Sequence, residues 1–120
     1  MNFNSNYKTF PIIIISFNQL FFLKHLLDFL RKCIYTNVIV INNNSTYKPL
    51  LNYFDSIASN ATIHRLKENY GYLVFWKTKE LNNKYSKGYF VITGPDIVRV
   101  KECLEDFILY FKRILDKNIN

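Results

Sequence analysis

The stretch Pro11-Ile12-Ile13-Ile14-Ile15-Ser16-Phe17-Asn18 decides the fold, because it is a strand apolar on both faces that ends in a polar tip. The same layout recurs at residues 38–46 and at residues 89–96. Strands of this kind lie inside a parallel sheet that helices cover on both faces. In such sheets ligands bind beyond the carboxyl ends of the strands. The pattern therefore predicts an α/β fold and a binding site at the polar tips.

The segments between these strands carry apolar residues at the spacing of helices and of one further strand. They predict helices over residues 19–33 and 49–58, a strand over residues 62–66, and a last helix with an apolar stripe from Leu104 to Leu115. Residues 70–85 are predicted as one helix, because a parallel sheet needs a crossover before the strand at residues 89–93.

The start of the second helix also carries local signals. Pro49 suits its first turn, and Ser45 or Thr46 is a candidate cap.

The alternating strands and helices imply right-handed crossovers and a three-layer α/β/α sandwich with a mainly parallel sheet. At 120 residues the chain is predicted to be a single domain spanning residues 1–120. Its 49% hydrophobic and 18% aromatic residues favour a packed core over disorder.

Several function classes find no support in the composition. No apolar run reaches the roughly 18 residues that span a bilayer, and the first residues lack a signal-peptide layout, so a cytoplasmic protein is predicted. Cys33 and Cys103 form no C-x-x-C motif and are predicted to be buried, reduced thiols. With three glycines, the chain has neither a Walker A loop nor a G-x-G-x-x-G fingerprint. Kinase, NTPase and classical dinucleotide-binding functions therefore lose their main support.

The net charge is +7, from 16 Lys and Arg against 9 Asp and Glu, and it is spread along the chain. The densest stretch runs over residues 77–87. A basic balance is compatible with nucleic acid, with an anionic membrane surface or with a phosphorylated ligand. It is equally compatible with lysines that only solvate helix faces. Charge alone leaves these alternatives open.

The polar tips carry a family resemblance. Ser16-Phe17-Asn18, Asn42-Asn43-Asn44-Ser45-Thr46 and Gly94-Pro95-Asp96 resemble, in order and spacing, the strand-end motifs of family 2 glycosyltransferases with the GT-A fold. Leu66-Lys67-Glu68-Asn69-Tyr70-Gly71 resembles a segment that lies between the second and third of these motifs. Bacterial members are similar around Thr93-Gly94-Pro95-Asp96-Ile97 and Cys103-Leu104-Glu105-Asp106-Phe107. The resemblance covers residues 10–116 and implies the nucleotide-binding half, with strand order 3-2-1-4.

The resemblance also implies a binding site for a nucleotide-diphospho-sugar. Its residues would be Ser16, Phe17, Asn18, Asn42, Asn43, Ser45, Asn69, Gly71, Thr93 and Asp96. Phe17 would line the base pocket, and the carbonyl of Asn42 or Asn43 would accept a hydrogen bond from the nucleobase in place of the family's acid. Asn69 and Gly71 would lie near the ribose and diphosphate. The competing interpretation is that residues 42–44 form a turn of residues that tolerate a left-handed backbone.

The third motif implies a divalent metal, Mn²⁺ or Mg²⁺, which would neutralise the charge that grows on the leaving diphosphate. Asp96 matches the last acid of the family's Asp-x-Asp motif and would be the metal ligand. Gly94 stands where the first acid would be, so metal binding would be weak. The alternative is that residues 94–96 form a turn that opens the last helix.

Three functions follow, in order of support. The first is what the resemblance implies: binding of a UDP-sugar for metal-assisted, inverting transfer to a glycan or lipid-linked acceptor of a cell-surface polysaccharide or lipopolysaccharide. The resemblance also implies peripheral contact at the inner face of the plasma membrane. The chain ends at Asn120, before the region that supplies the general base in the family, so no catalytic residue is assigned and the domain is expected to be truncated. The second is a non-catalytic nucleotide-binding or protein-interaction module. Nucleic-acid binding ranks last because no recognition motif is present.

A surface where an acceptor half would have packed is expected to be apolar. Dimerisation of two copies through that surface is therefore a further prediction.

Overall fold

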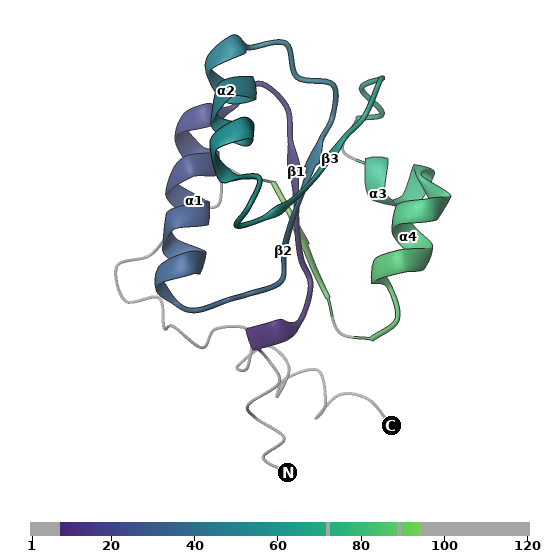
Figure 1. Ribbon diagram of the computed structural model, residues 1–120. Coiled ribbons are helices and arrows are strands. Elements are labelled where there is room, and N and C mark those ends of the chain that lie inside the picture. The colour runs from purple at the N-terminus through teal and green to yellow at the C-terminus, as the bar shows by residue number, and fades with distance from the viewer. Residues whose placement is uncertain (1–7, 72, 89, 95–120) are drawn as a thin grey trace.

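The computed structural model describes residues 8–71, 73–88 and 90–94. Strands and helices alternate along most of this range (Figure 1). The elements are β1 (Ile12–Ser16), α1 (Leu20–Lys32), β2 (Val38–Asn42), α2 (Lys48–Ile57), β3 (Thr62–Arg65), α3 (Val74–Lys77), α4 (Lys79–Tyr85) and β4 (Val91–Thr93). The predicted α/β class is confirmed.

The strands form one four-stranded parallel sheet in the order β3-β2-β1-β4. Both the parallel direction and the predicted order 3-2-1-4 are confirmed. In the register of β1 and β2, Ile12 pairs with Val38 and Ser16 pairs with Asn42. On the other side of β1, Ile14 pairs with Thr93 of β4. The most apolar strands of the sequence, β1 and β2, are therefore the two central ones.

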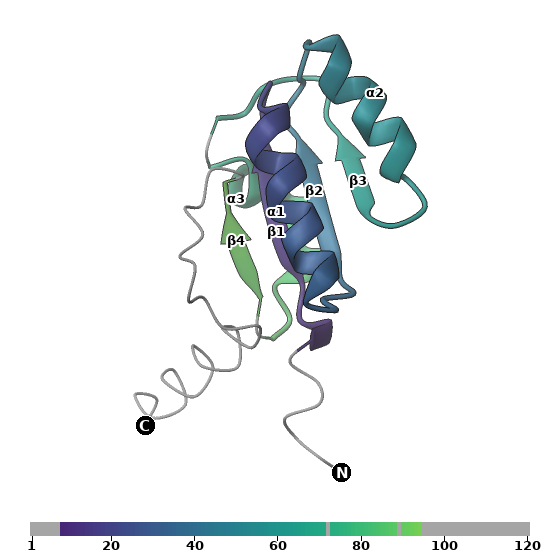
Figure 2. The same ribbon diagram turned by 90° about the vertical axis from the view of Figure 1, so that its left-hand side faces the viewer.

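Helices cover both faces of this sheet, which explains why the central strands lack a polar face. Figure 1 shows α1 and α2 on one side and α3 and α4 on the other, and Figure 2 shows α1 and α2 next to each other in front of the strands. Along β1 the side chains alternate: Ile12 and Ile14 pack with the core residues of α1 and α2. Ile13 packs with those of α3 and α4.

Each helical layer fills its face with large side chains. Leu23 and Leu30 of α1 and Phe54 of α2 are at most 1% exposed, and Phe75 of α3 is fully buried on the opposite face. Burying side chains of this size stabilises the fold by roughly 1.5–3 kcal/mol each before entropy is counted. Cys33, at the end of α1, is buried, as predicted. Cys103 lies outside the described residues.

Two local predictions are corrected. The expected single helix over residues 70–85 is two short helices, α3 and α4, because the backbone at Thr78 is extended with φ −101° and ψ 94°. The break lets Phe75 and Leu81 both reach the same core. Neither Ser45 nor Thr46 is the N-cap of α2: that residue is Tyr47, which makes no side-chain capping bond.

Of the other helix predictions, one is confirmed and one concerns residues that the structure does not describe. Pro49 does lie in the first turn of α2. The predicted last helix, with its stripe from Leu104 to Leu115, falls outside the described residues.

Candidate functional site

The candidate site lies at the carboxyl edge of the sheet, where β1, β2 and β4 end. Ser16 and Asn42 are register partners at the last position of their strands. Thr93 is the last residue of β4 and pairs with Ile14, two residues before the end of β1. The chain moves from β1 to β2 in one direction, while β4 pairs on the other side of β1. Such a reversal of strand order is where open α/β sheets bind ligands. Ser16, Asn42 and Thr93 therefore lie at the carboxyl edge of the sheet, where the sequence predicted the polar tips of the strands.

Ser16 is fully buried at this edge. Its carbonyl accepts a hydrogen bond from Asn43 N–H at 2.9 Å, which fastens the end of β1 to the turn after β2. Its hydroxyl Oγ has no hydrogen-bond partner among the residues that the structure describes. Burying such a group without a partner costs about 1–3 kcal/mol.

Asn42 organises the turn that follows β2. Its side chain is 3% exposed, and its Oδ1 accepts a hydrogen bond from Ser45 N–H at 2.9 Å. Asn44, inside this turn, has a left-handed backbone with φ 61°. An asparagine tolerates this conformation better than most residues do. Of the three residues interpreted as a turn, Asn42 therefore ends β2 and Asn44 alone has the left-handed backbone.

Asn43 connects β2 to the loop that follows β3. Its side chain is 2% exposed. Its Nδ2 donates to the carbonyl of Gly71 at 2.9 Å, and its Oδ1 accepts from Tyr70 N–H at 2.8 Å. In the same loop Asn69 Oδ1 accepts from Gly71 N–H at 2.8 Å, and Gly71 has φ 77°. The structure thus brings three of the expected site residues, Asn43, Asn69 and Gly71, into one network.

Asn18 makes the corresponding connection between the loops after β1 and β2. Its Oδ1 accepts hydrogen bonds from the N–H groups of Thr46 and Tyr47 at 2.8 and 2.9 Å. Its own N–H donates to Ser45 Oγ at 3.0 Å, and its Nδ2 donates to Thr46 Oγ1 at 3.3 Å. These contacts explain why the hydroxyls of Ser45 and Thr46 serve the loop rather than the helix.

Three partly exposed aromatic residues lie in the loops that Asn18 and Asn43 connect. Phe17 is 44% exposed, and Tyr47 and Tyr70, whose N–H groups the two asparagines hold, are 49% and 38% exposed. Phe17 is one of the site residues expected from the sequence, whereas Tyr47 and Tyr70 are not. Their signal was weak, since only their position next to strand-end asparagines distinguishes them from other aromatic residues of the chain.

Two cavities of the described part of the chain lie at opposite ends of the parallel strands. One of 530 Å³ lies by the β1–α1 turn and includes Asn18, Lys24 and Tyr47 in its lining. The other, of 560 Å³, lies between the carboxyl halves of α1 and α2, away from the strand tips. There burial, and secondarily the Asp28 carboxylate, raises the pKa of the Tyr53 hydroxyl, while Arg31 opposes the shift.

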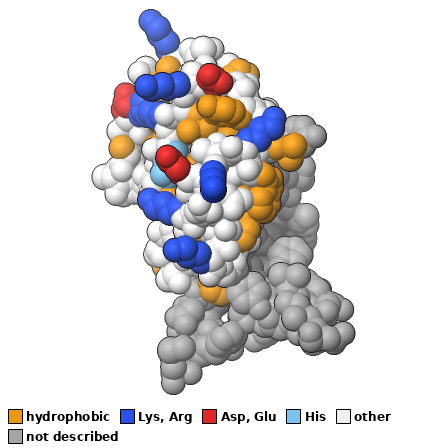
Figure 3. Space-filling view, turned by 90° about the vertical axis from the view of Figure 1, so that its right-hand side faces the viewer, with side chains coloured by type: hydrophobic (Ala, Val, Ile, Leu, Met, Phe, Trp, Pro, Cys, Tyr) orange, Lys and Arg blue, Asp and Glu red, His pale blue; other side chains and the backbone are white. Residues whose placement is uncertain are grey.

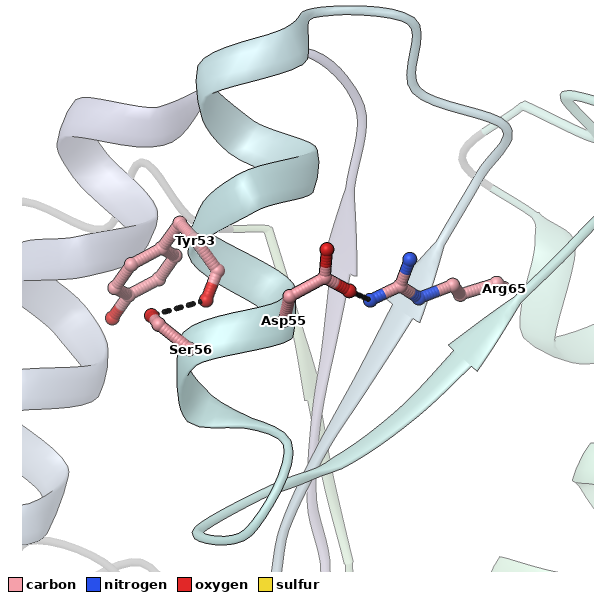
Figure 4. Close-up of polar contacts among 4 residues, drawn as sticks. All are labelled: Tyr53, Asp55, Ser56 and Arg65. Atoms are coloured by element: carbon pink, nitrogen blue, oxygen red, sulfur yellow. Dashed lines mark hydrogen bonds and ion pairs between the residues drawn. The ribbon is translucent and has the colours of Figure 1, made fainter.

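The polar contacts that α2 makes through Ser56 and Asp55 are structural. Figure 4 shows Ser56 Oγ donating to the carbonyl of Tyr53 within α2, at 2.7 Å. It also shows the ion pair of 2.6 Å between Asp55 of α2 and Arg65 of β3. Both partners of this pair are well exposed to solvent, so its contribution to stability is small. It nevertheless marks where α2 lies against the outer strand.

Charge on the face of the molecule that carries α3 and α4 is dispersed. Figure 3 shows the side of the molecule with α3 and α4, where lysine and arginine side chains are scattered between hydrophobic ones. The exposed large hydrophobic residues of this part of the chain are Tyr70, Leu73 and Trp76.

Among the described residues, the last side chains of β1, β2 and β4 are those of Ser16, Asn42 and Thr93, whose oxygens are neutral. Within residues 8–71, 73–88 and 90–94, no cluster of three or more His, Cys, Asp or Glu side chains is suited to hold a metal ion. Mg²⁺ and Mn²⁺ sites in proteins normally include carboxylates. The expected ligand, Asp96, lies outside the described residues, so the fit of a metal depends on that residue. Thr93 Oγ1 donates to the Gly94 carbonyl at 3.0 Å.

Within the same described ranges, no helix combines the length and the apolar character needed to cross a membrane. Searches of protein-family models, of curated proteins and of solved structures give no match to this chain.

Proposed function

We propose that this chain is a glycosyltransferase-like domain that binds a nucleotide-diphospho-sugar, with UDP as the nucleotide, at the carboxyl edge of its sheet. The observation that carries the proposal is the gathering of the polar ends of β1, β2 and β4 beside the reversal of strand order. Open α/β sheets bind nucleotides at this position. The helices on both faces agree with the three-layer GT-A arrangement that the motifs resemble.

The loops after β1, β2 and β3 support a preorganised site. Asn18 and Asn43 fix these loops through backbone hydrogen bonds, so little conformational entropy remains to be lost on binding. Phe17, Tyr47 and Tyr70 offer exposed rings of the kind on which bases stack. The sugar donor would be used for transfer to a glycan or lipid-linked acceptor, with a divalent ion held by Asp96 assisting departure of the diphosphate.

A second function has its own supporting observation. The carbonyl oxygens of Asn42 and Asn43 already accept hydrogen bonds from the chain's own backbone, and both side chains are almost completely buried. These groups stand where the related enzymes use an acid to contact the base. A non-catalytic module on the same fold, which binds a nucleotide weakly or binds a protein partner, would have this arrangement.

Calorimetric titration distinguishes the two functions. Wild-type protein is titrated with UDP and UDP-sugars, with and without Mn²⁺, alongside Asp96→Ala. We expect saturable binding that Mn²⁺ strengthens and that loses its metal dependence in Asp96→Ala, because that carboxylate would hold the ion against the diphosphate. Replacing Asp55, a carboxylate of α2 that pairs with Arg65, by alanine provides the control and leaves the metal dependence intact.

Absence of binding under every condition would reject the donor-site proposal and favour the interaction module. Binding of equal strength with and without Mn²⁺ would retain the nucleotide site and reject the role of Asp96.

A further inference from the structure

The loop after β3 is exposed, yet side chains hold its backbone at successive peptide groups. Tyr70 N–H donates to Asn43 Oδ1 at 2.8 Å, and the Tyr70 carbonyl accepts from Lys77 Nζ at 3.3 Å. Gly71 N–H donates to Asn69 Oδ1 at 2.8 Å, and its carbonyl accepts from Asn43 Nδ2 at 2.9 Å. Fixing an exposed loop in this way costs conformational entropy during folding. A ligand that binds the ordered loop then loses less conformational entropy on binding, so its affinity is higher.

The hydrogen bonds of Asn43 require an amide. Its oxygen faces the N–H of Tyr70 and its nitrogen faces the carbonyl of Gly71, so donor and acceptor are matched on both sides. An aspartate would keep the first bond but would direct a carboxylate oxygen at the Gly71 carbonyl. The residue is 2% exposed, so the added charge would also be buried.

We propose that Asn43 is a positioning residue, which fixes the loop so that the ring of Tyr70 forms a wall of the ligand site against which the nucleobase stacks. The inference rests on the proposed function. It replaces the expectation that the side chain at this position contacts the base directly. Tyr70 is suited to this role because its peptide is held on both sides while its side chain is 38% exposed.

Hydrogen exchange tests the positioning step without any ligand. In Asn43→Asp we expect the Tyr70 amide to exchange roughly tenfold faster than in wild type. The new carboxylate loses the bond to the Gly71 carbonyl and repels that oxygen, so the loop is held to β2 by one bond instead of two and opens more often. Asn44→Asp is the matched control, since it adds the same charge at the neighbouring, exposed position and keeps the wild-type rate at Tyr70. The slow exchange of Val40 in the core of β2 reports whether each variant is folded.

Titrations with UDP and with inorganic pyrophosphate test the ligand step. Asn43→Asp and Tyr70→Ala should each bind UDP roughly tenfold more weakly than Asn44→Asp and wild type respectively, because stacking on the ring is lost. Pyrophosphate, which has no base, should bind Tyr70→Ala as it binds wild type. Tyr70→Phe should restore UDP affinity, since it keeps the ring.

The outcomes are distinct. If Asn43→Asp binds UDP as tightly as wild type or more tightly, the side chain contacts the base directly and the proposal is overturned. An unchanged exchange rate at Tyr70 in a folded Asn43→Asp variant would overturn it as well. If wild type binds no UDP, the proposed function and the stacking role are both rejected, while the exchange comparison still decides whether Asn43 positions the loop.

Discussion

At the scale of single residues, Ile34 has the most unusual backbone in the part of the chain that the structure describes. This β-branched residue has φ 65° and follows the end of α1. Its N–H donates to the Arg31 carbonyl, and Tyr35 N–H donates to the Leu30 carbonyl, both at 3.0 Å. This is the Schellman motif, in which glycine normally occupies the position of Ile34. A left-handed backbone costs an L-residue roughly 1–2 kcal/mol.

We expect Ile34→Gly to raise the free energy of unfolding by about 1 kcal/mol, because it removes this strain. The Ile34 side chain is 69% exposed, so its loss removes little buried area. Urea denaturation measures the change. Lys32→Gly, at the last helical residue of α1, serves as the control and should lower the same quantity by about 1 kcal/mol. A lower midpoint for Ile34→Gly would mean that packing at the rim of the neighbouring cavity outweighs the strain.

Residue identities at the site were predictable, but their contacts were not. The sequence indicated that Ser16, Asn42 and Thr93 end their strands, since each follows an apolar run. It did not indicate that Asn43 accepts a hydrogen bond from the N–H of Tyr70, a residue 27 positions later. Such a pairing depends on how β2 and β3 lie next to each other, and no local pattern specifies it. Ligand binding by these residues stays a prediction.

At the scale of elements, helix α1 and strands β1 and β2 were predictable because their apolar patterns are long and uninterrupted. The segment at residues 70–85 was not, because Val74 and Phe75 have strand-like character while Leu81 and Tyr85 continue a helical pattern. The structure resolves this conflict with a break at Thr78 that turns the chain between α3 and α4. Packing against the sheet, rather than local propensity, sets that break.

The contact between β3 and α4 predicts a pH dependence. His64 Nε2 and Tyr85 Oη lie 2.7 Å apart across the two elements. Burial, and secondarily the charge of Lys84, lowers the pKa of His64 below its ordinary value. The unfolded chain therefore takes up a proton at this histidine first, near pH 6.5, as pH falls. Stability is then lost as pH decreases from about 6.5 through the folded pKa.

We expect His64→Gln to reduce the slope of unfolding free energy between about pH 7.5 and 5.5, since glutamine does not titrate. Urea denaturation across this range provides the measurement, with wild type in the same buffers. An identical slope in both proteins would show that His64 is protonated equally readily in the folded and unfolded chains.

At the scale of the whole molecule, the sheet separates two cores. Phe54 of α2 fills one and Phe75 of α3 fills the other, and both rings are fully buried. The alternating side chains of β1 join them, because Ile12 and Ile14 belong to one core and Ile13 to the other. A strand that must be covered on both faces is not stable with either layer alone. The two cores should therefore unfold together, as the predicted single domain requires.

Two reporters test this cooperativity. Trp76, the single tryptophan of the chain, lies on α3 with its ring centroid 5.2 Å from that of Phe75, so its fluorescence reports on one face. Far-UV circular dichroism reports on the whole chain. Phe54→Leu, on the opposite face, should lower the unfolding free energy by about 1–3 kcal/mol and shift both transitions equally. Phe75→Leu should do the same. If Phe54→Leu shifts the dichroism but leaves the Trp76 transition in place, the layer of α3 and α4 folds as a separate unit.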